Sequence, residues 1–196
     1  LMIYWKSGCK YLLKNDPIFV KYYNSSHKLV LNDNKFDVLF KSVCSQQISV
    51  SAAMSIYQSS KKIIGPINYK NFKNNISLVN KLPLTKNKKK CTQSIIKNYQ
   101  YVKKVRRNIT SIDYLRKNFI KIFGIGNWTI DMFAIFYLGY SNILPLGDLG
   151  FINAYKKFYN DNSLKKIPYY SNKWNNYSTI VTWYLWASYD EQPLYI

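Results

Sequence analysis

Acidic residues are scarce in this sequence: nine Asp and Glu accompany 29 Lys and Arg, for a formal net charge of +20. An excess of this size favours a polyanionic partner, most simply a nucleic acid. The alternative is a solvated basic surface in a chain rich in Lys, Asn, Ile and Tyr. That composition accounts for the lysines but not for the shortage of acids. Nucleic-acid binding is therefore the first expectation.

Histidine and cysteine are also rare. The single histidine is His27, and the three cysteines, Cys9, Cys44 and Cys91, lie far apart. This set excludes the usual ligand spacings of zinc sites and four-cysteine iron–sulfur clusters, and it disfavours a Ser-His-Asp triad. The odd cysteine count argues against a disulfide framework and fits a reducing compartment. No apolar run reaches transmembrane length, so we expect no membrane association.

Strand-like alternation is nearly absent, whereas apolar residues recur at helical spacing. At 196 residues and 47% hydrophobic content, the chain predicts one globular domain of one or two lobes. The predicted helical segments are 36–57 (interrupted by "CSQQIS"), 91–105, 111–123, 127–138, 148–159 and 174–188. We predict an all-α fold. Within the basic run 85–90 ("TKNKKK"), Lys86 to Lys90 is interpreted as a solvated face that adds non-specific affinity for DNA rather than as a specific contact.

The stretch "GIGNWTIDMFAIFYLGYSNILPLGDLG" (124–150) carries the most information. After a predicted helix, it supplies a Gly-Ile-Gly turn, a second helix, and then a turn whose one carboxylate is Asp148. Glycines permit positive φ and close backbone approach, so the amides of such a hairpin can meet a phosphate. Asp148 by itself is most simply explained as a helix N-cap, the commonest use of aspartate at such a position.

The whole arrangement resembles the helix-hairpin-helix (HhH-GPD) superfamily of DNA repair glycosylases. In that superfamily, a turn rich in Gly and Pro follows the hairpin by about twenty residues and carries an aspartate. Here "ILPLGDLG" occupies that place. Upstream "SVCSQQISVSAA" and downstream "WNNYSTIVTWYLW" are similar to segments of the 3-methyladenine DNA glycosylase II (AlkA-like) branch. The resemblance runs from about Asp16 to Trp186, and the chain looks like a minimal form that lacks the amino-terminal β domain.

The resemblance implies two helical lobes around a cleft. One lobe spans about 36–138, including the hairpin at 115–137, and the other combines about 1–35 with 139–196. It implies Asp148 as the catalytic residue. The other implied roles are a base pocket (Trp128, Trp186 and Met132), a wedge that replaces the extruded base (Gln47 and Gln46), and contacts to the DNA backbone (Gly124, Ile125, Gly126, Trp128 and Thr129).

No cofactor is implied for the chemistry, but a sodium or potassium ion at the hairpin is. Its ligands would be the backbone carbonyls of Ile120, Ile122 and Ile125. The implied partner is double-stranded DNA with damaged bases, bound by a monomer. The implied location is the bacterial cytoplasm with its nucleoid, or the nucleus of a eukaryote.

Flipping a base out of a duplex and hydrolysing its glycosidic bond fit these residue types. Tryptophan faces attract cationic alkylated purines, and a carboxylate stabilises oxocarbenium character or activates water. The expected function is thus a monofunctional DNA glycosylase for N-methylated bases in base excision repair.

Two alternatives remain. A non-enzymatic helix-hairpin-helix module would need neither Asp148 nor Gln47. A glycosylase/lyase of the endonuclease III type usually has a lysine where this chain has Trp128, and often a four-cysteine cluster. The branch also usually has an arginine where this chain has Ser178.

Overall fold

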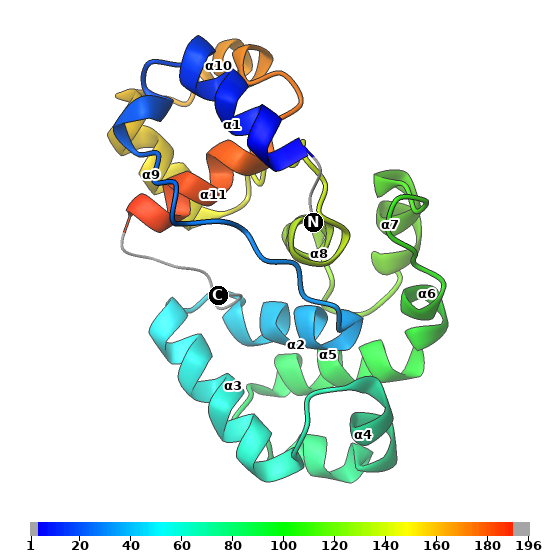
Figure 1. Cartoon of the computed structure of the whole chain (residues 1–196). Helices are drawn as coiled ribbons and strands as arrows, with labels where there is room; N and C mark the ends of the chain where they lie inside the picture. The colour runs from blue at the N-terminus through cyan, green and yellow to red at the C-terminus, as the bar shows by residue number, and fades with distance from the viewer. Residues whose placement is uncertain (1–3, 190–196) are drawn as a thin grey trace. The chain divides into compact units, whose positions relative to one another are not determined.

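The structure is a computed structural model that describes residues 4–189. All regular elements in this range are helical, and no strand occurs in it (Figure 1). The predicted all-α fold is confirmed. In the same range, no helix is both long and apolar enough to cross a bilayer.

The chain divides into two compact units, with boundaries after Val30 and after Leu138. The "hairpin unit" is residues 31–138, and the "aspartate unit" is the described part of the remainder, 4–30 with 139–189. The predicted second lobe also included 1–3 and 190–196, which lie outside the described residues.

Each unit is built from short helices. The hairpin unit contains α2 (Lys35–Ser45), α3 (Val50–Ile64), α4 (Tyr69–Asn74), η2 (Ile76–Lys81), α5 (Lys86–Lys97), α6 (Tyr99–Lys103), α7 (Ile112–Phe119), α8 (Asn127–Phe133) and the π-helical turn η3 (Ala134–Leu138). The aspartate unit contains α1 (Tyr4–Asn15), η1 (Phe19–Lys21), α9 (Leu149–Tyr159), α10 (Ile167–Lys173) and α11 (Ser178–Ser188).

Helix α2 is the centre of the hairpin unit and packs against α3, α5 and α8 (Figure 1). Its apolar residues at helical spacing, including Phe36, Leu39, Phe40 and Val43, are fully buried. The predicted break at "CSQQIS" separates α2 from α3, because Gln47 adopts a φ of +59° that a helix does not permit.

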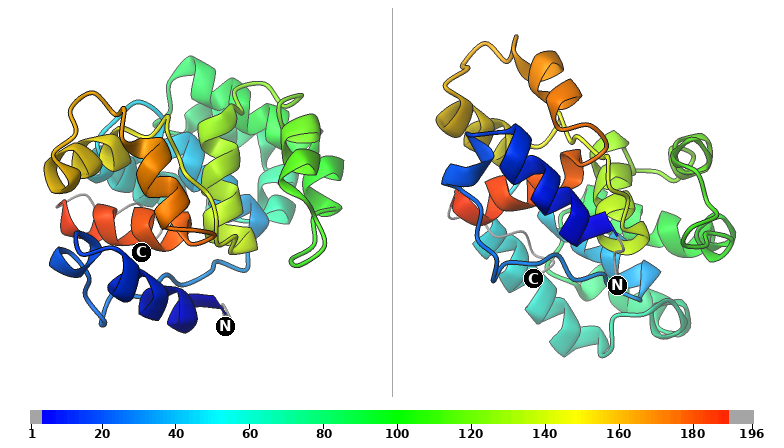
Figure 2. Two further views of the ribbon diagram at one scale, coloured as in Figure 1. Left: turned by 90° about the horizontal axis from the view of Figure 1, so that it is seen from above. Right: turned by 45° about the horizontal axis from the view of Figure 1, so that its top comes forward.

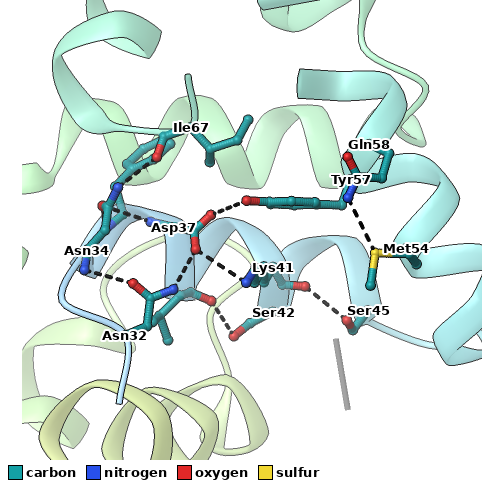
Figure 3. Close-up of polar contacts among 12 residues, drawn as sticks. Asn32, Asn34, Asp37, Lys41, Ser42, Ser45, Met54, Tyr57, Gln58 and Ile67 are labelled. Carbon is teal, nitrogen blue, oxygen red and sulfur yellow. Dashed lines mark hydrogen bonds and ion pairs between the residues drawn. The ribbon is translucent and has the colours of Figure 1, made fainter. Parts of the chain in front are cut away.

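A buried carboxylate fixes the start of α2. Asp37 accepts hydrogen bonds from the Tyr57 hydroxyl at 2.6 Å and from the Asn32 side chain at 2.5 Å, and Lys41 lies 3.5 Å away (Figure 3). Asn34 caps the helix by accepting from the amides of Phe36 and Asp37. One of the few acids of this chain is therefore structural, because a buried carboxylate requires such partners.

The aspartate unit is organised in the same way around Asp16, which is fully buried. Its Oδ2 accepts from the Tyr159 hydroxyl at 2.6 Å and from Trp174 Nε1 at 2.8 Å, and Oδ1 accepts from the amide of Ile18. These bonds connect the end of α1 with α9 and with the end of α10. Helix α11 packs against both α1 and α9, as the views in Figure 2 show.

One prediction of local structure is wrong, and another holds only in part. The segment 174–188 is not one helix: α10 ends at Lys173 and α11 begins at Ser178, with Asn175 at a φ of +55° between them. The basic run 85–90 is not a uniformly solvated face. It forms the first turn of α5, and Lys88 within it is buried, with Nζ donating to the Cys44 carbonyl at 2.8 Å.

Candidate active site

Asp148 stands at the amino terminus of α9. It is the last residue of a tight turn, which is closed by a hydrogen bond from the Asp148 amide to the Pro145 carbonyl at 2.9 Å. Its Oδ1 accepts from the Phe151 amide at 2.7 Å, which makes Asp148 the N-cap of the helix. The side chain is half-buried. The predicted helix from Asp148 to Tyr159 is confirmed, and the structure shows that the capping interpretation of Asp148 is also correct.

Trp186, on α11, contacts the same carboxylate. Its indole Nε1 donates to Asp148 Oδ1 at 2.8 Å, and the side chain is 3% exposed. A carboxylate has about four lone-pair positions, so two donors at Oδ1 do not exhaust its capacity as an acceptor. A hydrogen bond from a buried donor fixes the orientation of the carboxylate more firmly than a helix cap alone.

Gly150 makes this contact possible. A Cβ at Gly150 would lie 3.2 Å from Asp148 Oδ1 and 3.4 Å from both Nε1 and Cδ1 of Trp186. The distance to Oδ1 is tighter than ordinary van der Waals contact and the two distances to the indole are at its lower limit, so a side chain there would press mainly on the carboxylate. The motifs in the sequence predict no role for Gly150. The signal was present in "GDLG", a glycine placed in the first turn of a helix where it lowers helix propensity.

The loop before Asp148 is attached to the start of α11. The Thr179 amide donates to the Ser141 carbonyl at 3.0 Å, and its hydroxyl accepts from the Ile143 amide at 2.9 Å. The Ser178 hydroxyl donates to Asn142 Oδ1 at 2.7 Å. Ser178, which departs from the arginine usual in the resembling branch, thus joins the loop that carries Asp148 to the helix that carries Trp186.

The hairpin lies between α7 and α8, in the other unit. Ser111 caps α7 by accepting from the Tyr114 amide. Gly124 has a φ of +82°, and a Cβ there would come within 2.7 Å of Cβ and Sγ of Cys91 on α5. Gly124 therefore has both a positive φ and a neighbour too close for a Cβ, and each of these conditions requires glycine.

Gly126 differs from Gly124, and the expectation that its backbone needs a positive φ is wrong. Its φ is −112°, which any residue adopts, and a Cβ there would meet nothing within 4 Å. Positive φ is needed at Gly124 alone. Within the described residues, the amides of Gly126 and Asn127 donate to no acceptor. The start of α8 is thus open at the surface, as an approaching phosphate would require.

The other residues predicted to bind DNA or a base lie in and around α8. Trp128 is half-buried, whereas Thr129 and Met132 are each 1% exposed and Ile125 is 4% exposed. The Thr129 hydroxyl accepts from the Gln46 side chain, and its own O–H hydrogen is still a donor.

The two predicted wedge residues point differently. Gln47 is exposed at the break between α2 and α3, with its backbone in the left-handed region. Gln46 is turned toward the hairpin: its Nε2 donates to the Gly124 carbonyl at 2.9 Å and to Thr129 Oγ1 at 3.3 Å. A side chain held in this way does not fit the wedge role that was also predicted for Gln46.

The three carbonyls predicted to hold a monovalent cation belong to the same hairpin. The Ile122 carbonyl accepts from the Ile125 amide at 3.1 Å, and a carbonyl oxygen retains a second lone pair for a cation. No backbone amide of the described chain donates to the carbonyls of Ile120 or Ile125. The set of donors would consist of neutral carbonyl oxygens alone.

Solved structures show which fold class these features define. A DNA-3-methyladenine glycosidase from Bacillus halodurans is similar over 93% of this chain and 89% of its own, with a TM-score of 0.69 and 23% identity. The 3-methyladenine DNA glycosylase Mag1 of Schizosaccharomyces pombe, in complex with abasic DNA, is similar over 92% and 95%, with a TM-score of 0.74 and 20% identity. The chain therefore has the fold of the 3-methyladenine DNA glycosylases.

Sequence relatives carry related names. The chain is 38% identical over 77 residues to the putative DNA-3-methyladenine glycosylase YfjP of Bacillus subtilis, a match that covers 38% of this chain and 27% of YfjP. It is 34% identical over 79 residues to the alkylbase DNA glycosidase-like protein mag2 of S. pombe, covering 39% and 37%. The matches thus cover 27% to 37% of the length of these relatives. No family model matches. The predicted resemblance to alkylbase glycosylases is confirmed.

Proposed function

We propose that this protein is a monofunctional DNA glycosylase that removes alkylated bases from duplex DNA by hydrolysis. The observation that carries the proposal is the carboxylate of Asp148, held at the start of α9 by the Phe151 amide and by Trp186 Nε1. A fixed, half-buried carboxylate in a chain with a net charge of +20 is suited to stabilising positive charge that develops on a substrate.

DNA binding would begin at the hairpin. The amides at Gly126 and Asn127 and the surrounding lysines and arginines would contact phosphates, with the carbonyls of Ile120, Ile122 and Ile125 holding a monovalent cation against one of them. Flipping the damaged base costs a few kcal/mol, which phosphate contacts and DNA bending offset. Gln47, exposed at its turn, would fill the space in the stack.

Hydrolysis would then use Asp148. The C1′–N bond breaks with its electron pair leaving on the base, and the sugar acquires oxocarbenium character. The carboxylate stabilises this charge and accepts the proton of the water whose oxygen bonds to C1′. An N-alkylated purine is already cationic, so its departure needs no general acid. Trp128, Trp186 and Met132 are the proposed surroundings of the base, with cation–π attraction favouring a cationic one.

Schiff-base chemistry has no place in this proposal, because the hairpin carries Trp128 where bifunctional glycosylases carry lysine. The proposed substrate is double-stranded DNA with damaged bases, bound by a monomer. The protein would act where DNA is found, in the bacterial cytoplasm or in a nucleus.

The experiment is an excision assay on duplexes that each carry one lesion: 3-methyladenine, 7-methylguanine, hypoxanthine or an etheno adduct. Product strands should stay intact until alkali cleaves the abasic sites, and the methylated purines should react fastest. Binding of DNA without release of any base would favour a non-enzymatic helix-hairpin-helix module. Strand cleavage without alkali would favour a lyase.

A further inference from the structure

A side-chain amide joins the proposed wedge turn to the hairpin. Gln46 ends α2, and its backbone amide donates to the Ser42 carbonyl at 3.1 Å. Its side-chain Nε2 donates to the carbonyl of Gly124, which is 78 positions later in the sequence, at 2.9 Å. The second acceptor, Thr129 Oγ1, lies 3.3 Å away on α8. An amide nitrogen has two hydrogens, so each acceptor can receive one.

Helix α5 supports both partners of this bridge. Lys88 Nζ donates to the Cys44 carbonyl in the last turn of α2. Cys91 packs against Gly124 so closely that no Cβ fits there, and the Ser94 hydroxyl accepts from the Phe123 amide at 3.0 Å. Because one helix holds the end of α2 and the hairpin, their separation is set by the fold and the Gln46 bridge spans a defined distance.

Gln47 follows directly on this bridge. Its φ of +59° belongs to the left-handed region, which a non-glycine residue occupies only when its neighbours enforce it. On one side it is preceded by Gln46, fixed by its two hydrogen bonds, and on the other it is followed by Ile48 and then by Ser49, the N-cap of α3. The exposed side chain of Gln47 therefore takes its direction from Gln46.

We propose that Gln46 is a positioning residue that couples the two DNA-contacting elements of this unit. A phosphate held at the hairpin orders the Gly124 carbonyl, the carbonyl orders the Gln46 amide, and the amide fixes the turn from which Gln47 enters the base stack. This inference rests on the proposed function for its substrate. It assigns different roles to the two adjacent glutamines: Gln47 enters the base stack, and Gln46 acts through Gln47.

The test is a double-mutant cycle on Gln46 and Gln47. Gln46→Met keeps the length of the side chain but has no donor, and two hydrogen bonds of ordinary strength predict a loss of about tenfold in excision from a fully paired duplex. In a Gln47→Ala background the same change should reduce excision less than about twofold, because the residue through which it acts is gone. Melting temperatures of all variants show whether each is folded.

Two further measurements make the test independent of chemistry. A 2-aminopurine beside the target base reports unstacking in the complex, and we expect Gln46→Met to lower this signal while binding of undamaged duplex changes less than about threefold. Thr129→Val, which removes one acceptor, should lower it partially, and the loss should not add fully to that of Gln46→Met.

Independent, multiplying losses from Gln46→Met and Gln47→Ala would overturn the coupling and leave Gln46 a purely structural residue. An unchanged 2-aminopurine signal would overturn it as well. A wild-type protein that unstacks 2-aminopurine but releases no base would contradict the proposed glycosylase activity and leave the coupling standing.

Discussion

Trp186 Nε1 and the Phe151 amide donate to the same oxygen of Asp148, at 2.8 and 2.7 Å. One donor comes from α11 and the other from the first turn of α9. Because the two donors approach Oδ1 from different helices, together they restrict the orientation of the carboxylate more than either donor alone. A tryptophan expected to stack on a substrate base thus also holds the proposed catalytic group.

Replacing Trp186 by Phe tests this second role. Phenylalanine keeps an aromatic, apolar side chain at this buried position, although a smaller one, but the hydrogen bond to a charged acceptor is lost, so excision should fall about tenfold or more. Trp183→Phe is the matched control, since Trp183 lies on the same helix and donates to the His27 carbonyl at 3.2 Å. Single-turnover kinetics on methylated duplex compare the two. Equal losses in both variants would show that the helix, and not the contact with Asp148, is responsible.

Gly150→Ala should disturb the same pair from the other side. The new Cβ would lie 3.2 Å from Asp148 Oδ1, so the carboxylate or the indole must shift. Alanine also favours the helix by about 1 kcal/mol, so the protein should fold at least as readily. We expect slower excision without a lower melting temperature. Gly147→Ala is the control, because a Cβ there meets nothing within 4 Å. If both variants excise normally, the packing at Gly150 is irrelevant to the chemistry.

The two hairpin glycines should behave differently when each is changed to alanine. Gly124→Ala combines a φ of +82° with a 2.7 Å contact to Cys91, so it should lower the melting temperature as well as DNA affinity. Gly126→Ala has no strain and should fold normally. Weaker binding of undamaged duplex by Gly126→Ala would then report close approach of a phosphate. Unchanged binding by this variant would place the phosphate elsewhere.

Local sequence was sufficient for features that are decided locally. An aspartate before an apolar helical pattern predicted the start of α9, and "CSQQIS" predicted the break after α2. Features decided by distant contacts could not be predicted. The two glycines of Gly-Ile-Gly are indistinguishable in sequence, and it is the packing of Cys91 that makes Gly124 the constrained one.

The polar contacts of the candidate site illustrate the same limit. Nothing near Gln46 in the sequence indicates that its amide binds a carbonyl 78 positions away. Lys88 was indistinguishable from its neighbours in a basic run, yet it is the one that is buried and donates to Cys44. Likewise, Trp186 was predicted to lie near a base, but its bond to Asp148 depends on how α11 packs against α9.

Asp131 on α8 predicts a pH dependence of stability. Burial raises its pKa to about 6, and Arg116 opposes the shift. An unfolded aspartate has a pKa of about 3.9, so between about pH 4 and pH 6 the folded state binds more protons and stability falls as pH rises. Asp131→Asn cannot ionise. The melting temperature of this variant, measured relative to that of wild type, should therefore increase as pH rises from 4 to 7. A difference that is constant over this range would contradict the raised pKa.

Asp148→Asn separates the cap from the chemistry. The amide oxygen can accept from both Phe151 and Trp186, and the amide nitrogen replaces Oδ2, so the geometry at Oδ1 survives. Stability should therefore change by less than ~1 kcal/mol. Removing the negative charge from beside a developing oxocarbenium should slow excision ~10³-fold or more.

Binding of damaged duplex by Asp148→Asn should persist or tighten, because a carboxylate near phosphates is unfavourable. Borohydride should trap no adduct with either protein, since the hairpin carries no lysine at Trp128. Near-normal excision by the variant would reduce Asp148 to a helix cap.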